Sequence, residues 1–210
     1  MMNKARIAVF VSGGGTNLEA LLCAQERGEI PHGEIVLVCA SNASAYALTR
    51  AANHGVTGVA VPRKGSTQEA FEAGLSAHLA EHRIDVIVLA GFLSILSEEF
   101  VKQWPDRIIN VHPALIPSFC GKGMYGLKVH EAALEKGVKV SGATVHIVIP
   151  ECDAGPIVLQ KAVEVKQGDT PETLQKRIME EAEWKILPEA VRLFCDGKIT
   201  VENNKVYIGD

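Results

Sequence analysis

Long hydrophobic runs are missing from this sequence of 210 residues. No apolar stretch approaches the roughly 18 residues that a membrane-spanning helix needs. From Met1 the chain passes through Lys4 and Arg6 directly into a short apolar stretch, which is too brief for the core of a secretion signal. We therefore expect a soluble, cytoplasmic protein with no membrane segment.

An excess of positive charge is also missing. The chain has 21 Lys and Arg against 25 Asp and Glu, which gives a formal net charge of −4 at pH 7. A protein that binds nucleic acid mainly through its phosphates normally needs a basic face. The charge balance argues against such a protein, although it leaves room for small, localised anion sites.

The five cysteines include no close pair of the kind found in metal knuckles or redox motifs. They are scattered along the chain as Cys23, Cys39, Cys120, Cys152 and Cys195. We expect them to be reduced thiols, as in a cytosolic protein. Apart from His78 and His82, which we expect on the solvated face of one helix, the histidines outside His112 form no close set. The sequence therefore predicts no metal site.

Short β-branched segments alternate with amphipathic ones, a pattern typical of βαβ units and a mainly parallel sheet. With 47% hydrophobic residues, and without repeats or linkers, the chain can build one sizeable core. We expect strands at 6–11, 35–40, 58–61, 85–90 and 108–112, and helices at 16–26, 43–53 and 67–82.

The alternation changes after residue 112. Residues 113–126 contain two prolines and three glycines, so we expect an ordered surface loop there. The elements that follow are a helix at 127–136, strands at 140–149 and 157–165, a helix from 170 to about 194, and a small hairpin at 198–208. The two strands should pair antiparallel because their connection is short, and Pro188 should bend or divide the long helix. The expected fold class is α/β: a Rossmann-like, mainly parallel twisted sheet with helices on both faces and an antiparallel C-terminal strand pair.

Asn110 and His112 end the strand at 108–112, where alternate residues point to the same side. An amide and an imidazole together suit chemistry at a carbonyl, because both can donate hydrogen bonds to a developing oxyanion and His can carry a proton. Asp153, after a later apolar run, is the best candidate for a carboxylate that raises the pKa of His112. Taken singly, His112 could be a structural loop histidine, and Asp153 could only shape a turn.

Three consecutive glycines, Gly13 to Gly15, connect the first strand to the first helix. Backbone N–H groups at a helix N-terminus favour a phosphate. The spacing matches neither the dinucleotide-binding fingerprint nor the P-loop, so a monophosphate fits better. The simpler alternative is a tight turn capped by Thr16 or Asn17.

Seven short motifs occur in a specific order from Arg6 to about Phe194. They are Ser12-Gly-Gly-Gly-Thr-Asn17, Leu89-Ala-Gly-Phe92, Asn110-Val-His-Pro113, Leu115-Ile-Pro117, His130-Glu-Ala-Ala-Leu134, Ser141-Gly-Ala-Thr-Val-His146 and Asp153-Ala-Gly-Pro156. In this order and spacing they closely resemble the phosphoribosylglycinamide formyltransferase family. The resemblance implies one formyltransferase domain over residues 1–210. Its phosphate-binding half would extend to about residue 105, and its catalytic and folate-binding half would begin at about 106.

The resemblance also implies an activity. The formyl group of the cosubstrate 10-formyltetrahydrofolate would be transferred to the amine of glycinamide ribonucleotide (5-phosphoribosylglycinamide) in purine biosynthesis, without a metal. These two small molecules would be the partners of a monomer or homodimer that binds neither nucleic acid nor membrane.

The resemblance implies that Asn110, His112 and Asp153 form the catalytic group. Asn110 and protonated His112 would stabilise the oxyanion, and Asp153 would raise the pKa of His112. The residues implied to bind glycinamide ribonucleotide are Gly14, Gly15, Thr16, Asn17 and Glu183, the last at the ribose hydroxyls. Those implied to bind folate are Leu93, Ser94, Ile95, Leu96, Asn110, Val148 and Asp153, with the loop from 148 to 153 closing over the pterin.

Three residues depart from the family pattern. Ser94 and Gln68 stand where Arg is frequent, and Glu180 stands where Gln is frequent, which alters the expected contacts to the folate tail and the phosphate. The loop around Lys122 is longer than in the shorter family members. Lys122 either reaches an anionic substrate or stays in solvent.

Four other functions compete with this interpretation. A formyltetrahydrofolate deformylase (a hydrolase) would use water as acceptor and carry a regulatory domain ahead of the first strand, which we do not expect because that strand begins at Arg6. Methionyl-tRNA formyltransferases add an RNA-binding domain. Sugar-nucleotide N-formyltransferases, which act on a sugar amine, bind a diphosphate that suits the glycine loop less well. A nucleotide-binding module without catalysis is disfavoured by the intact catalytic group.

Overall fold

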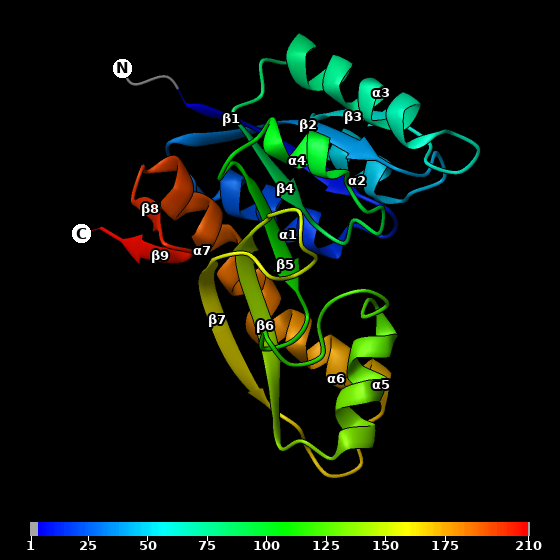
Figure 1. Cartoon of the computed structure of the whole chain (residues 1–210), viewed down its shortest axis with the longest axis vertical. Coiled ribbons are helices and arrows are strands. Elements are labelled where there is room, and N and C mark those ends of the chain that lie inside the picture. The colour runs from blue at the N-terminus through cyan, green and yellow to red at the C-terminus, as the bar shows by residue number, and fades with distance from the viewer. Residues whose placement is uncertain (1–3, 210) are drawn as a thin grey trace.

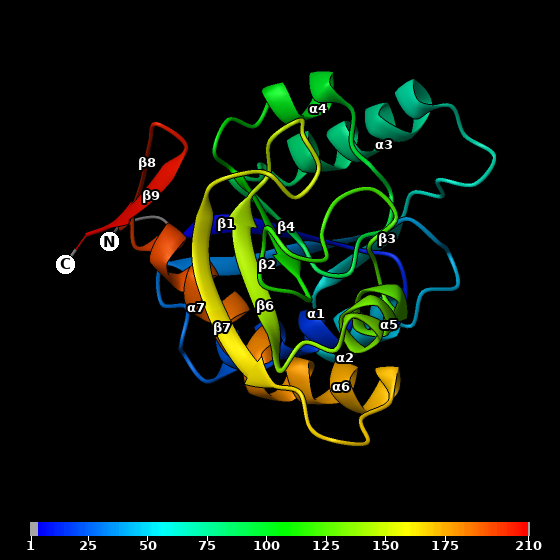
Figure 2. The same cartoon turned by 60° about the horizontal axis from the view of Figure 1, so that its bottom comes forward.

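The computed structural model describes residues 4–209 and is built on a seven-stranded sheet with the strand order β3-β2-β1-β4-β5-β6-β7 (Figures 1 and 2). Its strands are β1 (Ala5–Val11), β2 (Gly33–Ala40), β3 (Thr57–Ala60), β4 (Val86–Leu89), β5 (Ile108–His112), β6 (Val140–Ile147) and β7 (Ile157–Glu164). The first five strands in chain order pair in parallel, whereas β6 pairs antiparallel with both β5 and β7. The predicted fold class is confirmed.

Helices cover both faces of the sheet (Figures 1 and 2). They are α1 (Thr16–Glu26), α2 (Ala47–Asn53), α3 (Gln68–Glu81), α4 (Glu98–Lys102), α5 (Leu127–Lys136), α6 (Pro171–Ile178) and α7 (Trp184–Cys195), with a π-helical turn, η1 (Met179–Glu183), between α6 and α7. The hairpin of β8 (Ile199–Glu202) and β9 (Lys205–Ile208) ends the described chain. Within residues 4–209 no helix is both long and apolar enough to cross a bilayer.

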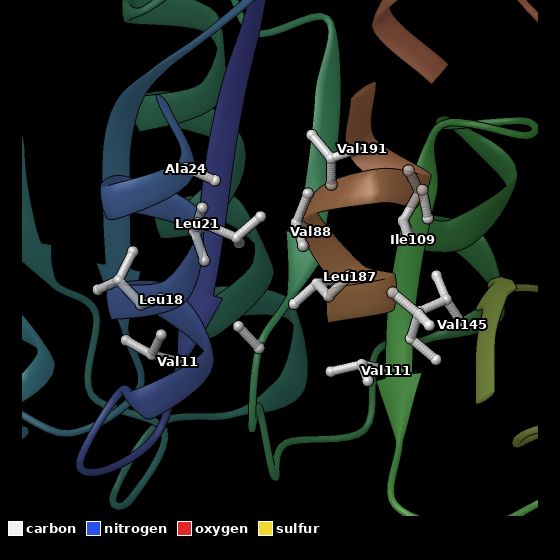
Figure 3. Packing of buried hydrophobic residues seen from close by; sticks show 14 of the residues in the cluster. Val11, Leu18, Leu21, Ala24, Val88, Ile109, Val111, Val145, Leu187 and Val191 are labelled. Atoms are coloured by element: carbon white, nitrogen blue, oxygen red, sulfur yellow. The ribbon is translucent and has the colours of Figure 1, made fainter. Parts of the chain in front are cut away.

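The core has two layers, because alternate residues of each strand point to opposite faces. Val9 and Val11 of β1 pack with α1 and α7, whereas Phe10 packs with Phe71 of α3 and Phe100 of α4. Figure 3 shows the first layer, in which side chains of α1 and α7 meet those of the central strands. Each fully buried Leu or Val contributes about 1.5–3 kcal/mol relative to an exposed one. The two layers fix β1, β4 and β5 at the centre, where the site lies.

Two helices differ from the sequence-based expectation. The predicted helix at 43–53 begins only at Ala47, because the Asn42 side chain accepts hydrogen bonds from Ser44 at 3.0 and 3.1 Å and holds a turn there. The five-residue α4 was not predicted, since a helix of little more than one turn leaves almost no periodic signal. The side chain of Ser97 caps its first turn.

The long C-terminal helix is divided, but Pro188 is not the point of division. α7 continues through Pro188, and the irregular segment is η1, which ends one residue before α7. Proline disturbs a helix least near its start, where fewer N–H groups have partners inside the helix. The hydrogen-bond spacing changes in η1, so the division of the helix lies about one turn before Pro188, the residue that was expected to divide it.

Candidate active site

A cavity of about 560 Å³ opens at the carboxyl ends of β4 and β5. In an open α/β sheet, ligands collect at this edge near the point where the strand order reverses, here between β1 and β4. The predicted site residues that line the cavity are Asn17, Leu93, Ser94, Ile95, Leu96, Asn110, His112, Val148, Asp153 and Glu183. Gly14, Gly15 and Thr16 lie outside the lining, directly before Asn17.

Asn110 and His112 share one face of β5, as predicted, and both line the cavity. The neighbouring strand places His146 directly opposite Asn110, and the Asn110 Nδ2 donates to His146 Nε2 at 3.0 Å. The other ring nitrogen, His146 Nδ1, donates to the Ile147 carbonyl at 3.0 Å. A carbonyl only accepts, so Nδ1 carries a hydrogen, and Nε2 is the ring nitrogen that meets the Asn110 amide. One of the two amide hydrogens of Asn110 therefore remains for a ligand.

His112 is 4% exposed and lies between a carbonyl and a carboxylate. Its Nε2 donates to the Phe119 carbonyl at 2.8 Å, and its Nδ1 is 3.6 Å from Asp153 Oδ2. The same carboxylate oxygen accepts a hydrogen bond of 2.8 Å from the Gly121 N–H, while Oδ1 is 3.7 Å from His146 Nε2. The loop after β5 and the loop after β6 thus meet at Asp153.

The charges of this group follow from burial and from these contacts. Burial alone would raise the pKa of Asp153, but His146, the Gly121 N–H and His112 together lower it to about 2, so Asp153 is ionised at neutral pH. For His112 burial is the largest effect and lowers its pKa, whereas the Phe119 carbonyl and Asp153 act in the opposite direction. The expected direction of the Asp153 effect is thus supported, because this carboxylate acts to raise the pKa of His112, but desolvation is the larger effect and the net pKa is lowered.

The glycine loop leaves the first turn of α1 open. Gly15 is the N-cap residue, with φ +73°, and among the described residues no side chain caps it. The alternative of a turn capped by Thr16 or Asn17 is wrong, since the Thr16 hydroxyl contacts Met179 Sδ at 3.6 Å and the Asn17 amide points to Glu183. The N–H groups of this turn are thus oriented as an anion site requires.

Residues of α2 hold the loop in this shape. The Arg50 Nε donates to the Gly14 carbonyl at 2.8 Å, and the Ala47 N–H donates to the Gly13 carbonyl at 3.1 Å. A Cβ on Gly15 would lie only 2.7 Å from the Cβ of Ala47. Gly15 therefore permits both the left-handed backbone and the close approach of α2.

Glu183, the last residue of η1, is 5% exposed and lines the cavity. Its Oε2 accepts a hydrogen bond of 2.5 Å from the Asn17 Nδ2. Burial raises the pKa of Glu183 to about 7, although the Asn17 amide favours the ionised form. The end of η1 and the start of α1 thus meet at one wall of the cavity.

His146 is the main residue of the candidate site that the sequence-based prediction omitted. It ends the motif Ser141-Gly-Ala-Thr-Val-His146, but in the sequence alone it lies close to no other histidine. The structure brings it to Asn110 and Asp153. The missing signal is the pairing of β5 with β6, since a register that places residue 110 opposite 146 puts both side chains on one face.

The residues that depart from the family pattern take different places. Ser94 lines the cavity, and so does Lys122. Gln68 does not; its Nε2 donates to the Ile95 carbonyl at 3.0 Å and so supports the 93–96 segment. Glu180 also lies outside the lining and pairs at 3.8 Å with the lysine four residues earlier.

Known proteins resemble this chain over most of its length. The sequence model of the formyl transferase family matches residues 5–191. The trifunctional purine biosynthetic protein adenosine-3 of Gallus gallus is 43% identical over 201 residues, which are 95% of this chain but 19% of that protein. The chloroplastic phosphoribosylglycinamide formyltransferase of Arabidopsis thaliana is 37% identical over 198 residues, 93% of this chain and 67% of that protein.

A solved structure extends the comparison to the fold. Glycinamide ribonucleotide transformylase 1 from Symbiobacterium toebii superposes with a TM-score of 0.92 at 41% identity, covering 99% of this chain and 95% of that chain. This chain spans about a fifth of the length of the trifunctional proteins, so only one part of each corresponds to it. Because the family match and the structural match both cover nearly all of the described fold, the resemblance drawn from the seven motifs is confirmed: the chain belongs to the formyl transferase family.

Proposed function

We propose that this protein transfers the formyl group of 10-formyltetrahydrofolate to the amine of glycinamide ribonucleotide, in purine biosynthesis. The observation that carries the proposal is the cavity itself. Asn110, His112 and Asp153 meet on one of its walls, and Asn17 and Glu183 meet on another. This arrangement supports a site for acyl transfer next to a site for a small phosphorylated substrate within one cavity.

The glycinamide ribonucleotide would bind at the start of α1. The open N–H groups from Gly15 to Asn17 would hold its phosphate, with Gly14 shaping the loop. Glu183 would accept hydrogen bonds from the ribose hydroxyls. Its bond to the Asn17 amide fixes the carboxylate against the phosphate loop, so one substrate would contact both.

The folate would occupy the wall formed by residues 93–96 and by residues 148–153. Leu93 and Ile95 are 60% and 65% exposed, which is unusual for large apolar side chains, and both line the cavity. An apolar surface open to a cavity suits a flat aromatic ring such as a pterin. Val148 and Asp153 would face the same ring from the opposite side.

The proposed mechanism is direct attack by the neutral amine on the formyl carbon. The free N–H of the Asn110 amide would donate to the oxyanion, and His112 would leave the Phe119 carbonyl and donate its Nε2–H to the same oxygen. The ionised Asp153 faces Nδ1, so a proton held there forms an imidazolium opposite a carboxylate. The proton lost by the amine would reach the leaving folate nitrogen through His112 or an ordered water.

We further propose that these two small molecules are the only partners needed for activity and that the protein acts in the cytoplasm as a monomer or homodimer. The cysteines support a reducing compartment, since all five lie within residues 4–209 and are free thiols there.

The proposal is tested by mixing the protein with 10-formyltetrahydrofolate, with and without glycinamide ribonucleotide, and measuring release of tetrahydrofolate. We expect release only when the amine is present, together with one equivalent of formylated product. Release at an equal rate without the amine would show a hydrolase instead. Binding of glycinamide ribonucleotide without formyl transfer would show a non-catalytic binding module.

A further inference from the structure

A second cluster of chemically reactive side chains joins α1 to α2, away from the cavity. Glu19, Cys23 and Glu26 follow one face of α1 at helical spacing, and His54 caps the end of α2 opposite them. None of the four lines the cavity, and the proposed mechanism uses none of them.

The geometry of this cluster is close. His54 Nε2 is 3.2 Å from Glu19 Oε1, and His54 Nδ1 is 2.6 Å from Glu26 Oε1. The ligating atoms of Glu19, Cys23 and His54 all lie within 4.8 Å of one another. The His54 side chain is only 14% exposed, so its ring is held in place, whereas Glu19 is 35% exposed and can adjust.

This set of donors matches the chemistry of zinc. Zn²⁺ binds thiolate at about 2.3 Å and imidazole or carboxylate at about 2.0–2.2 Å, which places ligand atoms of a tetrahedral site roughly 3–4 Å apart. Small rotations of Cys23 and Glu19 would bring the cluster to that size. A carboxylate on the second ring nitrogen, as Glu26 is here, is the partner that zinc-bound histidines commonly have.

We propose that Glu19, Cys23 and His54 bind a zinc-class divalent cation, with water in the fourth position and Glu26 orienting the His54 ring. Binding requires loss of the Cys23 thiol proton and of any proton on the bound His54 nitrogen. The site lies outside the cavity proposed for formyl transfer, so the metal-binding proposal does not depend on the proposed function.

Arg50 limits the affinity of this site without blocking it. Its guanidinium Nη1 is 2.9 Å from Glu19 Oε2, whereas the oxygen near His54 is Oε1. One carboxylate can therefore hold Arg50 through one oxygen and the metal through the other. The nearby positive charge weakens the attraction for a cation, so we expect reversible binding.

The test starts from metal-free protein, which is prepared by treatment with a chelator followed by removal of the chelator. Titration with Co²⁺ should give thiolate-to-metal charge-transfer absorption that saturates at one equivalent, and Zn²⁺ should abolish it. The affinity for Zn²⁺ is measured by competition with a chromophoric chelator. We expect Cys23→Ser to remove the charge-transfer band and to lower the Zn²⁺ affinity at least about a hundredfold, and Glu26→Gln to lower it about 10–100-fold.

Cys152→Ser is the matched control, because Cys152 is exposed and lies beside Asp153, which makes that pair the alternative position for a metal. This control should keep both the band and the affinity. A band that survives in Cys23→Ser, or that disappears in Cys152→Ser, would overturn the proposal. Circular dichroism of each metal-free variant checks that it folds, and His54→Gln gives a second variant in which the band should remain but the affinity should fall.

Discussion

Asn110 divides its two amide hydrogens between the protein and the cavity. His146 accepts one of them at 3.0 Å, which fixes the plane of the amide and leaves the other for a ligand. His112 is held in a similar way by the Phe119 carbonyl. Asn110, which keeps a free N–H, is thus oriented before any substrate binds, which is the condition under which hydrogen bonds lower a reaction barrier most. His112 must first release the Phe119 carbonyl before its Nε2–H can act as a second donor.

Asn110→Ala should lower kcat by about a hundredfold to a thousandfold and change the KM values much less, since it removes an oxyanion donor. Steady-state kinetics with both substrates measures this. Ser94→Ala, at the same cavity, is the control and should keep kcat within a fewfold. A near-normal kcat in Asn110→Ala would remove Asn110 from the proposed catalytic group.

Glu183 gives the protein a specific dependence on pH. Its pKa is about 7 in the folded state, above the usual value near 4.3 of an unfolded chain, so the folded state binds more protons between these values. The free energy of unfolding should therefore fall as pH rises from about 4.5 to 7. Glu183→Gln removes this contribution, and chemical denaturation of both proteins across that range measures the difference. An identical pH dependence in the two proteins would contradict the assignment.

Alternation along β5 was enough to predict that Asn110 and His112 share a face, because a strand has a period of two. The direction in which Asp153 acts on His112 was predictable from its charge, but the net pKa of His112 was not, because burial decides it and burial is a property of the packed molecule. The place of His146 beside Asn110 could not be predicted either, because it is a property of the folded sheet. Its position depends on which strand pairs with β5.

At the scale of elements, the site depends on two irregular helix ends. α1 begins without a side-chain cap, and η1 interrupts the helix that carries Glu183. Regular elements were predictable from periodicity, and β5 and α5 have the predicted bounds. The π-helical turn was not, since its sequence, Met179-Glu-Glu-Ala-Glu183, reads as ordinary helix.

Gly15→Ala should destabilise the protein by more than about 1 kcal/mol, because it places a Cβ on a left-handed backbone and against Ala47. It should also raise the KM for glycinamide ribonucleotide, since the loop must shift. Gly14→Ala is the matched control, because a Cβ there meets nothing within 4 Å. Urea unfolding and steady-state kinetics test the pair. Equal effects of the two substitutions would show that close packing at Gly15 is not what shapes the loop.

At the scale of the whole molecule, the cavity draws on segments from Asn17 to Glu183. The five parallel strands and the βαβ order were predictable, because local patterns determine both. How the two halves of the sheet join was not, since the antiparallel pairing of β5 and β6 depends on contacts between distant segments. Apolar residues have different roles in the core and in the cavity. Leu187 is buried in the core, whereas Leu93 is exposed in the cavity.

Leu187→Ala should lower the free energy of unfolding by about 2–5 kcal/mol, because Leu187 is fully buried between α7 and the sheet (Figure 3). Leu93→Ala should leave stability nearly unchanged and instead raise the KM for 10-formyltetrahydrofolate, since Leu93 is exposed in the cavity. Thermal unfolding and kinetics separate the two effects. A large loss of stability in Leu93→Ala would mean that this wall is part of the core.

The hydrogen bond between Asn17 and Glu183 joins residues 166 positions apart. During synthesis Asn17 emerges from the ribosome well before its partner, because 166 positions separate it from Glu183. A growing chain therefore lacks part of the cavity wall until Glu183 has been synthesised. Once the bond has formed, a bound ligand that spans both residues favours the finished molecule over every partly folded one.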